Sequence, residues 1–254
     1  MRNDTLPTVA PLTARSVLAS TLLGADSGEL PVAYLVHVAS LFAVNENRAR
    51  VALSRMVQAG ECSTDGVGNY RLAGHLLERQ QRQSASREGR KRRWRGDWHV
   101  VVVTTAGSSA EVRGSRRRAL ARARLAELRD GTWIRPGNLA VDLAKEVGRD
   151  VVIFTGRCSF GSDEVLTRLF DIDGWAKVAE ELLLGLDALV LRGSNDLAPG
   201  FVLSAAVLRH LQADPLLPSE LLGRSWPGDR LRRSYDDWDH RYREVLAEWS
   251  RSPA

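Results

Sequence analysis

Residues 42–60 read FAVNENRARVALSRMVQAG, and this stretch decides the fold of the N-terminal part of the chain. At about 100° per residue, its apolar side chains fall on one stripe of a helix and its polar side chains fall on the opposite face. The apolar stripe comprises Ala49, Ala52, Leu53 and Met56. The opposite face carries Asn47, Arg48, Val51, Ser54, Arg55 and Gln58, with Glu46 and Arg50 on its flanks.

The polar face of this helix has the composition of a surface that binds DNA. Arginine, asparagine and glutamine make bidentate hydrogen bonds with base edges, and serine reaches phosphate oxygens. A solvated helix that happens to carry arginines would show the same pattern, so the helix by itself leaves both interpretations open. If it binds DNA, the expected contacts are Asn45, Asn47, Arg48, Arg50, Val51, Ser54 and Arg55.

The neighbouring segments favour the DNA-binding interpretation. Upstream, residues 12–25 and the segment after Pro31 are predicted helices, and Asn45 is a suitable N-cap for the helix that follows. Downstream, residues 60–74 (GECSTDGVGNYRLAG) predict two short strands joined by a Gly/Asp/Asn turn. Three short helices followed by a hairpin is the order of a winged helix-turn-helix, in which the third helix enters the major groove.

The charge of the chain is concentrated in one short stretch. The 254 residues are 44% hydrophobic and 26% charged, which is ordinary for a soluble globular protein, and their net charge is +5. Residues 87–95, REGRKRRWR, contain six positive residues and one negative residue, a local charge of +5 that equals the whole excess. Such a run is usually a solvated linker, but beside a DNA-binding module it can follow the phosphate backbone. The expected backbone contacts are Arg90, Lys91, Arg92 and Arg93.

Cysteine content and hydropathy predict a cytoplasmic protein without a membrane span. Cys62 and Cys158 are far apart and neither belongs to a CxxC pair, so a disulfide framework is not expected. No apolar run approaches about 18 residues, the length that a transmembrane helix requires.

The pattern of elements predicts an α+β fold in several parts. Residues 97–105, 132–136 and 150–156 are predicted strands, and residues 115–129 and 138–148 are predicted helices between them. This alternation favours a ferredoxin-like sandwich, and the chain after Asp173 is mainly helical. We therefore expect a winged helix-turn-helix domain at 1–75, a basic linker at 76–96, a ferredoxin-like domain at 97–172 and a helical domain at 173–254.

Four stretches in this order resemble the PaaX family of bacterial transcriptional repressors. They are ARVALSRMVQAG (49–60), GTWIRPGNLA (131–140), RLFDIDGW (168–175) and DPLLPSELLGRSWPG (214–228). The resemblance implies the same three folded parts, a homodimer that represses aromatic-acid catabolism genes, and release by an aryl-acyl-CoA thioester. The recognition helix of the family corresponds to 45–59 here. The chain departs from the family pattern at Glu61-Cys62, where many members have an aromatic or long apolar residue.

An acyl-CoA effector would need cationic donors beside an apolar pocket. The arginine-rich helix and the strand after it supply Arg116, Arg118, Arg122, Trp133 and Arg135. A different interpretation is that the arginines form a solvated face paired with Glu127 and Asp130, and that Trp133 is a core residue.

Enzyme signals are weak throughout the sequence. The expected ferredoxin-like domain is similar to small metal-dependent nucleases, but these need a carboxylate at the end of the first strand, where this chain has Thr104 and Thr105. The five histidines form no HxxxH or HExxH pair. We expect no catalytic residues, metal or cofactor. A nuclease and a basic scaffold that binds nucleic acid without sequence preference are the alternatives to a sequence-specific regulator.

Overall fold

The computed structural model describes residues 12–25, 27–89, 91–105, 107, 109–139, 143, 150–158, 163–223 and 225–251. In this part of the chain, helices and two small sheets confirm the predicted α+β class. The chain forms two compact units, each built from segments that are distant in sequence. Unit 1 comprises Met1–Ala85, Leu184–Arg209 and Arg233–Ala254, and unit 2 comprises Ser86–Leu183 and His210–Arg232.

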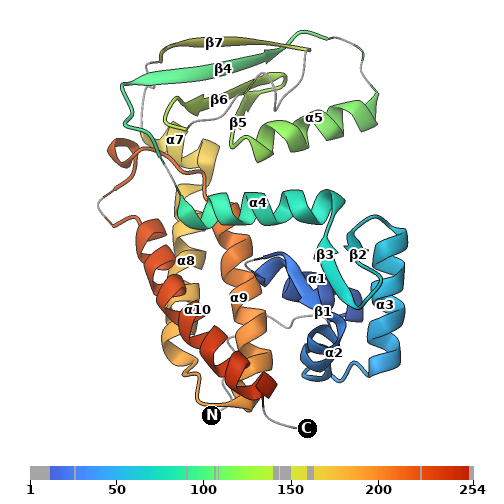
Figure 1. Cartoon of the computed structure of the whole chain (residues 1–254). Coiled ribbons are helices and arrows are strands. Elements are labelled where there is room, and N and C mark those ends of the chain that lie inside the picture. Colours follow the sequence, from blue (N-terminus) through green and yellow to red (C-terminus); the bar gives the residue numbers. More distant parts are fainter. Residues whose placement is uncertain are drawn as a thin grey trace. The chain divides into compact units, whose positions relative to one another are not determined.

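The N-terminal part of unit 1 combines three helices with a three-stranded antiparallel sheet in the residues described (Figure 1). The helices are α1 (Ala14–Gly24), α2 (Val32–Ser40) and α3 (Glu46–Gln58). The strands are β1 (Glu29–Pro31), β2 (Cys62–Thr64) and β3 (Asn69–Leu72), in the sheet order β1-β3-β2. These bounds confirm the three predicted helices and the predicted hairpin.

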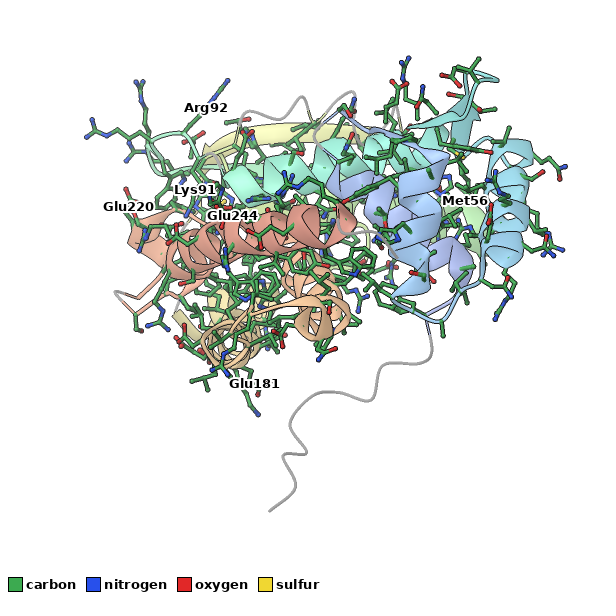
Figure 2. All side chains as sticks on the ribbon, turned by 60° about the horizontal axis from the view of Figure 1, so that its bottom comes forward. Met56, Lys91, Arg92, Glu181, Glu220 and Glu244 are labelled. Carbon is green, nitrogen blue, oxygen red and sulfur yellow. The ribbon has the colours of Figure 1, made fainter. Side chains whose placement is uncertain are left out.

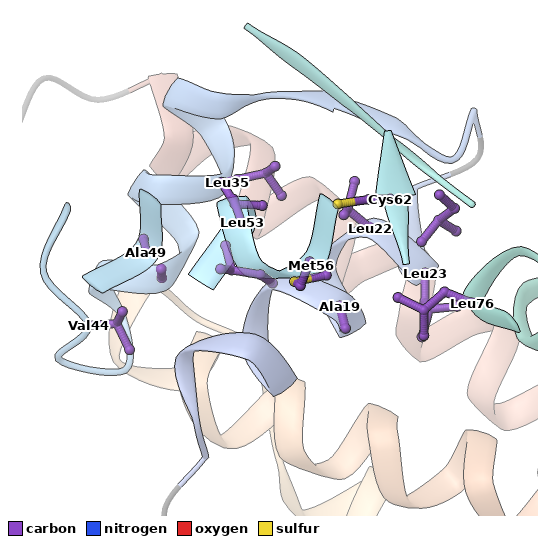
Figure 3. Close-up of a cluster of buried hydrophobic side chains, with 13 residues drawn as sticks. Ala19, Leu22, Leu23, Leu35, Val44, Ala49, Leu53, Met56, Cys62 and Leu76 are labelled. Atoms are coloured by element: carbon purple, nitrogen blue, oxygen red, sulfur yellow. The ribbon is translucent and has the colours of Figure 1, made fainter. Parts of the chain in front are cut away.

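Helix α3 packs its apolar stripe into the core of unit 1 (Figure 3). Ala49 and Leu53 are completely buried, and Met56 is 1% exposed. The other buried members of this cluster are Leu18, Ala19, Leu22, Leu23, Leu35, Ala39, Val44, Cys62, Leu72 and Leu76. The helix begins where predicted, because Asn45 Oδ1 accepts a hydrogen bond of 2.9 Å from the backbone N–H of Arg48. The core therefore fixes which face of α3 points outward.

Strand β1 was not predicted from the sequence. It pairs antiparallel with β3, and Glu29 lies opposite Arg71. Arg71 Nε donates to Glu29 Oε2 at 3.0 Å. Three residues are too few to show an alternating pattern, so pairing with β3 rather than local preference forms this strand.

Helix α4 (Gly74–Glu88) occupies the first part of the segment that we expected to be a linker. Its residues are mostly polar, which is why the sequence favoured a linker. Two contacts attach it to unit 1: Leu76 is 2% exposed in the core, and Gln80 Nε2 donates to the carbonyl oxygens of Leu23 and Ala25 at 3.4 and 3.0 Å. The expected linker is therefore helical up to Glu88.

The prediction that the chain after Asp173 is mainly helical is confirmed. The helices are α8 (Ile172–Ala188), α9 (Leu197–Gln212) and α10 (Gly228–Arg251), with short 3-10 turns η1 (Ser194–Asp196) and η2 (Ser219–Leu221). Within unit 1, α9 and α10 contact the region of α2. The rings of Phe42 and Phe201 lie 4.9 Å apart, and the rings of His37 and Trp249 stack at 3.9 Å. None of the helices described here is long and apolar enough to cross a membrane.

Unit 2 contains a four-stranded antiparallel sheet of β4 (Asp97–Val103), β5 (Ala126–Arg129), β6 (Thr132–Pro136) and β7 (Val151–Arg157), in the order β5-β6-β4-β7. Helix α5 (Ala110–Arg122) lies along one face, where Leu120 packs with Val101 and Trp133 (Figure 1). Helix α7 (Asp163–Phe170) packs Leu166 against Trp98 and Ile134.

The helix predicted over 115–129 is wrong in its second half. Helix α5 ends at Arg122, and Arg124 adopts a left-handed backbone conformation with φ 61°. The chain then forms β5, whose Ala126 pairs with Ile134 of β6. A run of good helix formers is overridden here by strand pairing and by burial of Leu125 and Ala126. Of the helix predicted over 138–148, all residues except 138, 139 and 143 lie outside the described residues.

Glu61, one of the departures from the family pattern, is a buried acid that pairs with Arg15 of α1. The Glu61 residue is 7% exposed, and Arg15 Nε donates to Glu61 Oε2 at 2.8 Å, while Arg15 Nη2 donates to Oε1. His75 Nε2 lies 3.8 Å from Glu61 Oε1. Hydrogen bonding to Arg15 lowers the pKa of Glu61 below its ordinary value of 4.5. The carboxylate therefore stabilises unit 1 in its ionised form.

We predict that Glu61→Gln lowers the free energy of unfolding at pH 7 by about 1 kcal/mol, because a charge-assisted pair becomes a neutral one and Arg15 is half exposed. Since the pKa of Glu61 is lower in the folded state, the stabilisation is present above pH 4.5 and is lost as the pH falls through the folded-state pKa. Urea denaturation of wild type and variant at pH 7 and at acidic pH measures this difference.

The matched control is Glu78→Gln, which removes an exposed carboxylate 3.5 Å from Arg82. We expect it to change the unfolding free energy by less than about 0.5 kcal/mol. A Glu61→Gln effect that persists unchanged at acidic pH would contradict the role assigned to its charge.

Candidate nucleic-acid interface

The outward face of α3 is the side that the sequence predicted to be polar. Ala49, Leu53 and Met56 face the core, and Figure 2 shows Met56 on the inner side of the helix. The residues of the opposite face are all exposed: Asn47, Arg48, Val51, Ser54, Arg55 and Gln58. The face therefore presents two arginines, two amides and a hydroxyl to the solvent. No other part of the described chain covers these groups.

The charged groups on this face differ in their partners. Arg50 Nε donates to Glu46 Oε1 at 2.7 Å, one turn earlier in the same helix. In the described structure, the guanidinium groups of Arg48 and Arg55 form no hydrogen bond or ion pair with another residue. Asn45 uses its side-chain oxygen to cap the helix, and its amide nitrogen can still donate to another partner. Arg48 and Arg55 are thus the cations of α3 most available to an anionic ligand.

The turn between β2 and β3 was predicted as a hairpin turn, but none of its residues was predicted as a contact. Asp65 Oδ1 accepts from the backbone N–H groups of Val67, Gly68 and Asn69 at 2.9–3.0 Å. These bonds lower the pKa of Asp65, so its charge helps to hold the turn at neutral pH. Val67 at the tip is 87% exposed. An apolar residue between two glycines in a turn was the signal that could have identified this tip.

The basic stretch of unit 2 is held by its backbone and by Trp94. The backbone N–H of Arg92 donates to Asn138 O at 2.7 Å. Trp94 Nε1 donates to Asp97 O at 2.6 Å, and its ring meets Trp98 edge to face at 5.9 Å. The Lys91 ammonium lies 3.9 Å from an Asp229 carboxylate oxygen. Trp94 thus anchors the stretch to the sheet of unit 2.

The arginine side chains of the stretch nevertheless reach the solvent. Arg92, Arg93 and Arg95 are exposed, and Figure 2 shows the Arg92 side chain projecting away from the ribbon. Arg90 lies outside the described residues. The segment is therefore a fixed backbone that carries solvated positive charges.

The predicted ligand residues divide into an exposed set and a buried set. Arg118 and Arg122 are exposed on α5. Arg116 lies 3.4 Å from Asp150 and donates to Thr105 Oγ1 at 2.9 Å. Trp133 is 7% exposed and belongs to the core below α5.

Arg135 is the most buried of these residues, at 1% exposure. Its guanidinium donates to Pro136 O and Ala123 O at 2.9 Å and to Asn138 Oδ1 at 3.2 Å. Burial, and next the charge of Arg124, lower the pKa of Arg135 to about 9. The structure thus places Trp133 and Arg135 in the interior, whereas Arg118 and Arg122 remain on the surface.

Part of the helix α5 surface is paired, as the solvated-face interpretation expected. Arg117 Nη2 lies 3.0 Å from Glu127 and 3.6 Å from Asp130. Among the described residues, no group of three or more His, Cys, Asp or Glu side chains could hold a metal ion.

Comparisons with known proteins match both units. Residues 13–76 match the family model described as PaaX-like protein, and residues 91–163 match the PaaX protein central Cas2-like domain. A solved structure of an uncharacterized protein from Mycobacterium tuberculosis is 38% identical, with a TM-score of 0.75, and the match covers 93% of this chain and 98% of that chain. No curated protein matches the chain. The first family match contains α3 with its hairpin, and the second contains the basic stretch and the four-stranded sheet.

Proposed function

Because the chain belongs to the PaaX family, we propose that it is a sequence-specific DNA-binding transcriptional regulator, acting as a homodimeric repressor in the cytoplasm. The observation that carries this proposal is the exposed face of α3, with Arg48 and Arg55 free of acidic partners in the described structure. A helix anchored by a buried stripe presents these side chains in a fixed orientation, which base recognition requires.

The arrangement of elements supports the assignment of unit 1 as a winged helix-turn-helix. In that assignment α2 and α3 are the helix pair, α3 enters the major groove, and β2 with β3 is the wing. The exposed tip at Val67 then lies where a wing contacts the neighbouring groove or backbone. The proposed contacts of α3 are Asn45, Asn47, Arg48, Arg50, Val51, Ser54 and Arg55, with Arg50 in competition with its Glu46 partner.

In unit 2, the antiparallel order β5-β6-β4-β7 and the chain order of its elements support a ferredoxin-like fold. The similarity of that fold to metal-dependent nucleases makes nuclease activity the second candidate function, and non-specific binding is the third. A titration of operator DNA against competitor DNA at two salt concentrations separates them. A sequence-specific regulator retains a preference of about a thousandfold or more.

We predict that Arg55→Ala weakens operator binding by about 1–3 kcal/mol, roughly five- to 150-fold, while non-specific binding changes much less. The reason is that a bidentate arginine–guanine contact exists only at the correct base. Arg55→Lys is the matched control, because it retains the charge but loses the bidentate geometry, so it should lose specificity and keep non-specific affinity. Fluorescence anisotropy on both DNAs measures this. Equal losses on both would show that Arg55 contacts phosphate only.

A further prediction concerns the salt dependence of binding. Replacement of Arg92, Arg93 and Arg95 by alanine should flatten the slope of log K against log salt by up to roughly three units, because each phosphate contact releases counterions. The preference for operator over competitor DNA should not change. Arg117→Ala is the control, since that arginine is already paired with two acids. An unchanged slope in the triple variant would mean that these side chains remain solvated in the complex.

Another prediction tests an aryl-acyl-CoA effector at the surface of α5. Of the residues predicted for this site, Trp133 and Arg135 lie in the interior, so the proposed surface site comprises Arg116, Arg118 and Arg122. Arg118 and Arg122 are exposed and can be replaced without disturbing the core. Calorimetry with phenylacetyl-CoA should show binding that each of Arg118→Ala and Arg122→Ala weakens by about tenfold, since each removes a charge-assisted hydrogen bond. Arg129→Ala, an exposed arginine on β5, is the control. Binding that survives both substitutions unchanged would move the site elsewhere.

A further inference from the structure

Arg232, near the start of α10, is a buried cation with one unused donor. Its Nε donates to Ser86 O at 3.2 Å, and its Nη2 donates to Asp214 Oδ2 at 2.7 Å. The side chain is 7% exposed, yet Nη1 is buried without a hydrogen-bond partner, and the Asp229 carboxylate lies 3.9 Å from it. A buried donor without an acceptor costs roughly 1–3 kcal/mol, so such a group calls for an explanation.

A second unused donor is held beside it. Trp226 Nε1 is also buried and has no hydrogen-bond partner. The Trp226 ring stacks on Trp175 with centroids 4.5 Å apart, and Trp175 stacks on His210 at 4.3 Å. This three-ring stack fixes the plane of Trp226 and therefore the direction in which its N–H points.

Both donors converge on Gly228, the first residue of α10. A β-carbon on Gly228 would lie 2.4 Å from Trp226 Nε1 and 3.2 Å from Arg232 Nη1. Both donor atoms therefore lie close to Gly228, and a side chain at this position would clash with the Trp226 nitrogen. The first backbone N–H groups of a long helix such as α10, with 24 residues, lack intrahelical partners and carry partial positive charge.

The surroundings of these donors contain more positive than negative charge. Arg124 donates to the backbone oxygens of Gln212 and Asp214 and to Ser86 Oγ. Arg135 donates to backbone oxygens and an amide oxygen only. Among the described residues of unit 2, Asp214 is the one buried carboxylate near these three arginines. Burial lowers the pKa values of Arg124 and Arg135. The charge of a neighbouring arginine lowers each of them further, while Asp214 raises that of Arg124.

We propose that Trp226 Nε1, Arg232 Nη1 and the start of α10 form a binding site for an oxyanion group, a carboxylate or a phosphate, of a small molecule. An oxyanion is an acceptor for both unused donors and neutralises the excess charge. Because both donor atoms are buried, the ligand is a small molecule and not the backbone of a nucleic acid. The site uses none of the residues assigned to DNA or to the α5 surface, and its occupancy is measured without DNA.

The experiment titrates the full chain with sodium phosphate and, in parallel, with sodium acetate, each against sodium chloride at the same ionic strength. The first readout is the NMR resonance of the Trp226 indole N–H, identified by its absence in Trp226→Phe. The second is the rise in melting temperature, because a ligand that binds only the folded state stabilises it. The two arms distinguish a phosphate group from a carboxylate group.

We expect a saturable shift of the Trp226 resonance with at least one of the two anions. Trp226→Phe keeps the aromatic ring and removes one donor. Arg232→Lys removes Nη1, and Gly228→Ala places a methyl group against both donors. Each should weaken binding by about tenfold or more, as judged from the melting temperature. Asp229→Asn is the matched control on the same helical turn: it removes a negative charge and keeps both donors, so it should bind at least as tightly as wild type.

If Arg232→Lys fails to fold, as circular dichroism would reveal, Trp226→Phe and Gly228→Ala still decide the matter. A resonance and a melting temperature that respond to phosphate and acetate no more than to chloride would overturn the proposal, and the donors would then be satisfied by water. Binding that Trp226→Phe and Gly228→Ala leave unchanged would overturn it as well.

Discussion

The burial of Ala49, Leu53 and Met56 against α1 and α2 is the interaction on which unit 1 depends. Full burial of a leucine or methionine side chain contributes roughly 1.5–3 kcal/mol, and both are almost completely buried here. Rotating α3 by one residue would turn Arg50 or Ser54 toward the core, and burying an unpaired guanidinium costs far more than the stripe contributes. The rotation of the helix is therefore fixed, and with it the set of side chains that faces outward.

Two arginine-rich helices of the chain illustrate why residue type alone does not identify a binding surface. On α3, Glu46 neutralises Arg50, but Arg48 and Arg55 have no acid within ion-pair distance in the described structure. On α5, Arg117 lies between Glu127 and Asp130, both supplied by the β5 strand and the turn after it. The difference comes from tertiary structure, because Glu127 and Asp130 become neighbours of Arg117 only when β5 folds back beside α5.

Sequence reasoning succeeded where the stabilising interactions are local and failed where they are distant. The start of α3 follows from Asn45, whose side chain caps a backbone N–H three residues later, and the mainly helical structure after Asp173 was also predicted. Strands β1 and β5 exist because Glu29 pairs with Arg71 and Ala126 with Ile134, and neither pairing leaves a local pattern. The buried donors of Trp226 and Arg232 were likewise invisible, because burial of a tryptophan nitrogen or an arginine depends on segments far away in sequence.

Helix α10 connects these observations, because its first residues belong to unit 2 and its remainder belongs to unit 1. Gly228 and Arg232 lie at its start, and Trp249 near its end stacks on His37 of α2. A ligand at the start of the helix changes DNA affinity only if it binds the two functional states with different affinity.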